Sequence, residues 1–215
     1  MTVVVDYGMG NLRSVQKAFE RIGRPAEIRH DPEAVARAER LVLPGVGAFT
    51  DAMRALDERG LVEPIREFCA TGRPLLGICL GLQVLLEESE EIAGGPGSAP
   101  GRPPQGLGVV PGRVVRFDSS LAERGLKVPH MGWNSVEVVR EEPLFHGMAK
   151  QGVYFYFAHS YYAAPSDEAV VAGWTGYGQP FASAVASGNV LATQFHPEKS
   201  QAAGLALLEN FVTRT

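Results

Sequence analysis

The chain has 215 residues, of which 45% are hydrophobic and 20% charged, a composition typical of a globular protein. Its net charge of −4 at pH 7 gives no long-range attraction to phosphate backbones, so we expect no nucleic-acid partner. It has no apolar run long enough to cross a bilayer, and its first residues lack a secretory signal, so we expect a cytoplasmic protein without membrane contact. We expect one domain over residues 1–215.

The first part of the chain alternates short apolar runs with longer amphipathic stretches. Strands are predicted at residues 2–6, 27–30, 40–43 and 74–78. Helices are predicted at residues 11–22, 48–58, 62–70 and 80–88. Strand–helix alternation of this kind indicates an α/β fold, with an open and mostly parallel sheet flanked by helices.

The pattern changes at residues 92–108, which contain GGPGSAPGRPPQG and are predicted to be an exposed loop. The turn Ser187-Gly188-Asn189 predicts a hairpin, and residues 202–212 are predicted to form a closing helix. Further strands are predicted at residues 113–117, 135–139, 153–158, 169–174, 181–186 and 190–194. The strand-rich second half therefore favours a mixed sheet.

The pentapeptide Gly77-Ile78-Cys79-Leu80-Gly81 follows an apolar strand and precedes a helix. This is the glycine-framed pattern of a nucleophile elbow, with cysteine as the nucleophile. Small neighbours relieve the sharp turn, and the positive end of the following helix favours a thiolate. The alternative is a buried structural cysteine, which the two glycines make less favourable. Cys69, the second of two cysteines, lies in a helical pattern without glycines, and we expect it to fill the core.

A thiol nucleophile needs a base, and His196 is the best placed of the five histidines. It follows an apolar strand, and Pro197 favours an extended backbone after it. Residues two apart in an extended segment point to the same side, so Glu198 can reach the imidazole and fix its tautomer. The alternative is a strand-end turn with a solvated glutamate. The pairing with a glycine-framed cysteine favours a catalytic triad of Cys79, His196 and Glu198.

Acyl transfer also requires donors for the developing oxyanion. The backbone N–H of Leu80, next to the nucleophile, is one candidate. The turn Pro44-Gly45-Val46-Gly47 supplies another, because it ends a predicted strand and its glycines allow a peptide unit to turn its N–H inward. We expect the Val46 amide to serve, after a peptide flip if necessary. The alternative is a tight turn without a catalytic role.

The segment Gly8-Met9-Gly10 does not indicate a nucleotide site. The third glycine of the dinucleotide-binding pattern is missing, and the sequence has no P-loop motif. We expect no cofactor and no metal, and without a phosphate cradle the chain shows no means of binding a nucleotide or activating an acceptor.

Six segments of the sequence resemble the class I glutamine amidotransferases and, more narrowly, the glutaminase subunits of imidazole glycerol phosphate synthases. They are DYGMGNLRSV (6–15), LPGVGAF (43–49), GICLGLQVLLEESEE (77–91), VPHMGWNSV (128–136), YFYFAHSYY (154–162) and ATQFHPEKSQ (192–201). The resemblance covers nearly the whole chain and implies a flavodoxin-like domain. It also implies that Cys79 attacks the carboxamide of L-glutamine. The chain departs from the family in a longer Gly/Pro-rich stretch at residues 94–106.

The resemblance also implies roles for other residues. Glutamine would be held by Gln83, Glu91, Ser160 and Tyr161, beside the oxyanion segment with Gly45 and Gly47. A (βα)8-barrel cyclase would dock on the same face as a heterodimeric partner and use the ammonia to make imidazole glycerol phosphate and aminoimidazole carboxamide ribotide in histidine biosynthesis. The residues implied at that interface are Asn11, Trp133, Asn134, Tyr156 and Lys199. For Trp133 alone, a place in the core is as consistent with the sequence as a place at the interface.

The sequence is also consistent with two other functions. The chain could serve another class I amidotransferase, such as an anthranilate or pyridoxal-phosphate synthase, if that synthase stimulates its glutamine turnover. It could also be a non-catalytic docking subunit, which would leave Cys79 unlabelled by a glutamine-mimicking electrophile.

Overall fold

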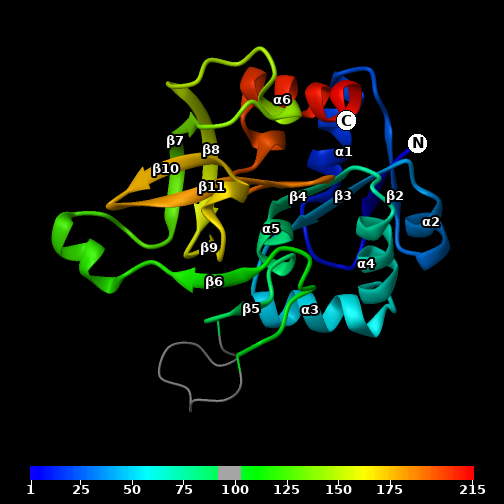
Figure 1. The fold of residues 1–215 in the computed structure, drawn as a ribbon, viewed down its shortest axis with the longest axis horizontal. Helices are drawn as coiled ribbons and strands as arrows, with labels where there is room; N and C mark the ends of the chain where they lie inside the picture. Colours follow the sequence, from blue (N-terminus) through cyan, green and yellow to red (C-terminus); the bar gives the residue numbers. More distant parts are fainter. Residues whose placement is uncertain (92–102) are drawn as a thin grey trace.

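A computed structural model describes residues 1–91 and 103–215, and within them 12 strands form one mixed sheet (Figure 1). Its main path runs β2-β1-β3-β4-β12-β11-β10-β7-β8. The first five strands of this path pair in parallel. Their bounds are Thr2–Val5 for β1, Ala26–Arg29 for β2, Arg40–Gly45 for β3, Leu75–Cys79 for β4 and Val190–Thr193 for β12.

Helices cover both faces of this parallel part. Helices α1 (Leu12–Arg21) and α6 (Gln201–Arg214) lie on one face, where Phe19 and Phe211 pack against Val4 of β1. The other face packs against the remaining helices, and Val3 and Val5 point to it because side chains alternate along a strand. These helices are α2 (Pro32–Arg37), α3 (Phe49–Glu58), α4 (Val62–Ala70) and α5 (Leu80–Val84).

The rest of the sheet is almost entirely antiparallel. A hairpin turn after Ser187 joins β11 to β12, as predicted, and the path continues through β10, β7 and β8. Strand β9 pairs with both β11 and β6, and the short β5 is parallel to β6. The bounds are Glu88–Ser89 (β5), Gly112–Arg116 (β6), His130–Val138 (β7), Val153–His159 (β8), Tyr161–Pro165 (β9), Val171–Tyr177 (β10) and Gln179–Ser187 (β11). The 3-10 helices are Ser119–Arg124 (η1), Pro143–Phe145 (η2), Glu168–Val170 (η3) and Pro197–Lys199 (η4).

The predicted α/β fold with an open mixed sheet is confirmed, but the helix predicted at residues 80–88 is too long. Helix α5 ends at Val84, because distant backbone groups take the hydrogen bonds that would continue it. The N–H of Leu107 donates to the Val84 carbonyl over 2.7 Å, and the N–H of Val110 donates to the Leu85 carbonyl over 3.0 Å. Glu87 then donates to Gly112, which leads the chain into β5.

Three strands differ clearly from the sequence prediction. Strand β9 and the short β5 were not predicted, and β7 begins at His130 rather than at residue 135. Residues 92–102 of the predicted Gly/Pro-rich loop lie outside the described part of the chain, whereas Gln105 forms a single bridge with Glu88. No helix in the described segments is both long and apolar enough to span a bilayer.

Candidate active site

Cys79 is the last residue of β4 and directly precedes α5. Its φ of 55° lies in a region that side-chain-bearing residues rarely adopt, and this strain turns the chain from the strand into the helix. The predicted strand-to-helix elbow is therefore present. It places the sulfur above the carboxyl edge of the parallel strands, where open α/β sheets bind their ligands.

The two glycines that frame Cys79 are required by close packing. A Cβ at Gly81 would overlap the backbone carbonyl of Leu43 in the neighbouring strand. A Cβ at Gly77 would lie 2.9 Å from Leu85 Cδ1 and 3.1 Å from Ala192 Cβ. The glycines therefore allow α5 to lie directly against the sheet, which fixes the position of the sulfur.

His196 follows β12, which is the parallel neighbour of β4, so both residues emerge at the same sheet edge. Its Nδ1 lies 2.8 Å from Oε1 of Glu198, and the two side chains are only 3% and 2% exposed. Since Nδ1 faces the carboxylate, Nε2 is the ring nitrogen left for Cys79, which lines the same cavity as His196. The structure thus brings together the three residues that the sequence singled out.

The electrostatics of His196 are dominated by two opposing effects. Burial disfavours the charged imidazolium, but negative charge on Cys79 and hydrogen bonds to Cys79 and Glu198 outweigh it and raise the pKa of His196. The imidazole is therefore held in its charged form, from which it can donate a proton to a leaving group.

Cys69 has a different environment. It lies in α4, partly buried against the core, and burial raises the pKa of its thiol to about 11. Its thiol therefore stays protonated, and its side chain packs against the core, as the sequence predicted.

A cavity of about 300 Å³ opens beside Cys79 and His196. Most residues predicted to bind glutamine or to form the oxyanion hole line it. They are Val46, Gly47, Leu80, Gln83, Glu91, Ser160 and Tyr161. Gly45 lies just behind the lining, in β3, where it is paired directly with Cys79.

Two polar side chains in the cavity wall already have internal partners. Gln83 uses both hydrogens of its amide nitrogen, donating to the Tyr161 carbonyl over 2.8 Å and to Oε1 of Gln194 over 3.2 Å. Its own oxygen remains for a ligand. Glu91 accepts a hydrogen bond from the N–H of Phe49, the first residue of α3, while burial raises the pKa of its carboxyl. The wall thus presents oxygen atoms suited to an ammonium group.

Two residues near Cys79 were not identified from the sequence. Gln194 is fully buried and donates from Nε2 to the Cys79 sulfur over 3.7 Å, although its sequence context indicated only the end of a strand. Tyr7 is also fully buried, and its hydroxyl lies against Gly45. Burial and charge on Cys79 raise the pKa of Tyr7, so it stays protonated. The DYG segment that carries Tyr7 was the available signal.

Four of the five residues predicted to contact a partner lie at the surface, on elements that are in contact with one another. Trp133 is 46% exposed, so its predicted alternative as a core residue is wrong. It is paired with Tyr156 across β7 and β8, and Lys199 places its ammonium 5.8 Å from the Tyr156 ring. Asn11 is exposed at the start of α1, which contacts η4, the helix that carries Lys199.

Asn134, the fifth of these residues, is half-buried and uses its side chain for contacts within the chain. Its amide nitrogen donates to the Gly176 carbonyl over 3.0 Å and lies 3.3 Å from Nε2 of His130. Its oxygen accepts from the N–H of Ser135. These contacts leave its side chain occupied within the chain.

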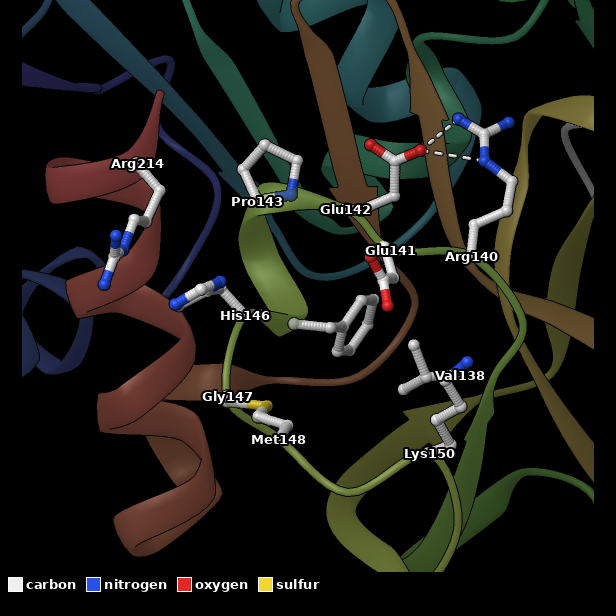
Figure 2. Close-up of a pocket in the computed structure, with 11 residues that line it drawn as sticks. Val138, Arg140, Glu141, Glu142, Pro143, His146, Gly147, Met148, Lys150 and Arg214 are labelled. Atoms are coloured by element: carbon white, nitrogen blue, oxygen red, sulfur yellow. Dashed lines mark hydrogen bonds and ion pairs between the residues drawn. The ribbon is translucent and has the colours of Figure 1, made fainter.

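A larger cavity of about 560 Å³ lies at the other end of β7, between η2 and α6 (Figure 2). Its charged groups do not converge on a common point. Arg140 is paired with Glu142, whereas Arg214 lies on α6 at the opposite side of the group drawn in Figure 2. This cavity contains none of the residues that the sequence singled out for chemistry.

The fold and the cysteine-centred site indicate an amidotransferase of the α/β class. Comparison of the sequence with known protein families supports this assignment. The family model described as glutamine amidotransferase class-I matches residues 3–215, and the chain belongs to this family. Two solved structures share the fold. One, described as a glutamine amidotransferase, has a TM-score of 0.71 at 23% identity and covers 98% of this chain and 99% of that one. PurLQS from Thermotoga maritima has a TM-score of 0.73 at 18% identity and covers 99% and 97%.

Relatives with higher sequence identity belong to one kind of subunit within this family. Imidazole glycerol phosphate synthase subunit HisH of Syntrophotalea carbinolica is 54% identical, over 98% of both chains. The subunit HisH of Geobacter sulfurreducens is 51% identical over 97% of this chain and 96% of its own, and that of Sulfurimonas denitrificans is 50% identical over 98% and 97%. Within the class I amidotransferases, the chain groups with the HisH subunits.

Proposed function

We propose that this chain hydrolyses L-glutamine to glutamate and ammonia with Cys79 as nucleophile, His196 as acid and base, and Glu198 as the residue that orients the imidazole. The observation that carries the proposal is the position of His196, whose Nδ1 is bound to the buried Glu198 carboxylate while its ring lines the same cavity as Cys79, so that Nε2 is free to face the sulfur. We further propose that residues 1–215 act as one domain in the cytoplasm.

The reaction needs two steps of acyl transfer. The Cys79 thiolate attacks the carboxamide carbon, and His196 delivers its proton to the leaving nitrogen, so that ammonia and a thioester result. His196 then takes a proton from water, and the resulting hydroxide attacks the thioester, which releases glutamate and restores the thiolate. Glu198 keeps Nδ1 protonated throughout, so Nε2 handles every proton.

The oxyanion formed in each step requires backbone donors. Leu80 begins α5, so its N–H is one of the free donors at a helix start and lies next to the nucleophile. Val46 follows β3 and is 39% exposed, next to Gly47 with a φ of 106°. A turn with this freedom supports a peptide flip, and we propose that the Val46 amide completes the oxyanion hole when a partner is bound.

The polar groups of the cavity wall indicate where the ammonium group and the carboxylate of glutamine bind. The free oxygen of Gln83 and the Glu91 carboxylate accept hydrogen bonds from the ammonium group of glutamine. Ser160 and Tyr161 line the remaining wall, where they hold the carboxylate end.

The ammonia is passed to a (βα)8-barrel cyclase that docks as a heterodimeric partner over the cavity mouth. This part of the proposal is supported by the names of the HisH relatives, which describe subunits of imidazole glycerol phosphate synthases. It is also supported by exposed apolar side chains at the mouth, since Met131 is 64% exposed and lines the same cavity as Cys79. Trp133, Tyr156 and Lys199 continue this docking face, with Asn11 at its edge.

The test uses the complex with the candidate cyclase and compares two nitrogen sources. Cys79→Ala should abolish synthesis from glutamine while leaving synthesis from ammonium salts unchanged. Cys69→Ala is the matched control, because it removes the other thiol, which lies on α4 and does not line the cavity, and it should retain both activities. Equal loss of both activities in Cys79→Ala would refute the division of labour.

A diazoketone analogue of glutamine provides a second measurement that does not need the cyclase reaction. It should label the wild-type chain and Cys69→Ala at Cys79, and it should not label Cys79→Ala. A chain that is never labelled would instead support a non-catalytic docking subunit.

A further inference from the structure

A buried pair of histidines connects strand β7 with the wall of the catalytic cavity. His130 begins β7 and His159 ends β8, and their rings meet with Nδ1 of His130 at 3.0 Å from Nε2 of His159. On the outer side, Nε2 of His130 lies 3.3 Å from the amide nitrogen of Asn134. On the inner side, Nδ1 of His159 lies 2.9 Å from the carbonyl oxygen of Tyr161.

The Tyr161 carbonyl continues this chain of hydrogen bonds to the nucleophile. It accepts a second hydrogen bond, from the amide of Gln83 over 2.8 Å. Gln83 also donates to Gln194, and Gln194 donates to the Cys79 sulfur. Every link is therefore a contact between buried or partly buried polar groups, and the chain ends on the reacting atom.

Only one arrangement of protons satisfies all of these contacts with neutral rings. A carbonyl oxygen can only accept, so Nδ1 of His159 carries a proton and its Nε2 accepts. Nδ1 of His130 must then donate, and its Nε2 accepts from the Asn134 amide. The oxygen of Asn134 accepts from the N–H of Ser135 over 2.8 Å, which fixes the amide at the outer end.

The surroundings of the pair favour these neutral forms. The His130 ring stacks on Phe157 at 4.8 Å and on Tyr177 at 4.0 Å, and Phe117 and Phe181 enclose the His159 ring. Burial in this aromatic environment lowers the pKa of His130 to about 4 and that of His159 to about 3. Both rings are therefore uncharged at neutral pH, with fixed tautomers.

We propose that His130 and His159 are positioning residues for glutamine hydrolysis, which hold the Tyr161 carbonyl and, through it, the Gln83 and Gln194 amides against Cys79. The inference rests on the proposed function and adds two residues to its machinery. Neither histidine touches the sulfur in this arrangement, so each acts through the groups that it holds. A hydrogen-bonded network of this kind gives one defined position to each member, whereas an apolar pair would leave the Tyr161 carbonyl with only the hydrogen bond from Gln83.

The key test compares two amides at position 159 in the complex with the cyclase. In His159→Asn the amide nitrogen takes the place of Nδ1 and can still donate to the Tyr161 carbonyl. In His159→Gln the amide takes the place of Nε2, so it can meet His130 but not the carbonyl. We expect kcat for glutamine to fall about tenfold in His159→Gln, as for one lost hydrogen bond, and to stay within about threefold of wild type in His159→Asn.

A purely structural role would give the opposite order. Asparagine removes more volume from the aromatic cluster than glutamine, so stability alone would make His159→Asn the worse enzyme. Phe117→Leu is the matched control, because it loosens the same cluster without removing a hydrogen bond and should keep kcat near wild type. Equal kcat and KM in His159→Gln and wild type would overturn the proposal.

The shared path gives an independent prediction for a double substitution. His130→Phe and His159→Phe should each lower kcat, and the double variant should be no worse than the poorer single one, because both cut the same chain. Multiplicative losses would contradict a single chain. Imidazole 15N spectra of the wild-type chain should show both rings neutral with Nδ1 protonated at pH 7, and an Nε2-protonated ring would overturn the arrangement.

Failure of the proposed function would look different. A wild-type complex that does not hydrolyse glutamine would refute the function itself. An active wild-type complex with unaffected histidine variants would refute only their positioning role.

Discussion

The parallel and antiparallel parts of the sheet contribute to the catalytic cavity in different ways. The parallel part supplies backbone geometry, since Cys79, Leu80 and Val46 sit where β4 and β3 end. The antiparallel part supplies a wall of side chains around Ser160 and Tyr161, between β8 and β9. Strand β12 belongs to both, because it pairs in parallel with β4 and antiparallel with β11.

The two parts of the site also differ in how the sequence encodes them. The elbow at Cys79 depends on five consecutive residues, whereas the wall depends on contacts between segments far apart in the sequence. The residues after β12 connect the two, because Gln194 donates to the sulfur and His196 lines the cavity beside it, and both follow the strand that the parts share. Substitutions in each part can therefore test whether the two contributions are separable.

The largest effect is expected for Glu198→Gln, which removes the carboxylate bound to His196 after β12, the strand that joins the two parts of the sheet. Without the carboxylate, Nδ1 of His196 need not keep its proton, and the imidazole can adopt the wrong tautomer for the sulfur. We expect kcat for glutamine hydrolysis to fall about a thousandfold, with ammonium-dependent synthesis unchanged. Steady-state kinetics of the complex would measure this, and Glu209→Gln, an exposed carboxylate on α6, is the control.

The same division explains how far the sequence could predict the site. Cys79 with its glycines and the pair His196–Glu198 were predictable, because their geometry follows from neighbours one or two positions away. The corresponding strands were also predictable, since buried parallel strands form continuous apolar runs.

The other part of the site could not be predicted in this way. His130 and His159 stand 29 positions apart and meet only because β7 and β8 pair in one register. Gln194 is indistinguishable in sequence from any polar residue at a strand end, and its role depends on Gln83 from helix α5, more than a hundred positions earlier. Strand β9 was missed because it begins directly after β8, with no turn signal except Ser160.

In the parallel part, Gly81→Ala should destabilise the fold. An alanine within a helix is normally favourable, but here the added methyl would overlap the Leu43 carbonyl. We expect a loss of about 3 kcal/mol in the free energy of unfolding, measured by urea denaturation. Gly176→Ala is the control, because nothing in the described residues lies within 4 Å of its added Cβ. Similar stability of both variants would show that α5 can move away from the sheet.

In the antiparallel part, the buried histidine pair should make stability depend on pH. The pKa values of His130 and His159 are lowered to about 4 and about 3, so the unfolded chain binds protons below pH 6.5 that the folded chain does not. Their stabilising contribution is therefore present above pH 6.5 and lost as the pH falls. We expect the free energy of unfolding to fall by about 2 kcal/mol between pH 6.5 and 5.5.

Urea denaturation of wild type and of the double variant His130→Phe/His159→Phe would isolate this contribution, because all other groups are shared. His196 does not interfere, since its pKa is raised and its contribution is lost only as the pH increases above 6.5. An equally steep dependence in the double variant would show that the pair is not buried in neutral form.

The smallest effect is expected at the docking face, where the two parts meet a partner. Trp133→Ala removes a large side chain that is 46% exposed beside Tyr156, and we expect the affinity for the cyclase to fall about tenfold. Val139→Ala is the control, because Val139 is 47% exposed but follows the other end of β7. Titration calorimetry would compare them. Since Trp133 touches neither Cys79 nor His196 in the site described here, saturating cyclase should restore glutamine turnover in Trp133→Ala, whereas a persistent loss would mean that this tryptophan also shapes the catalytic cavity.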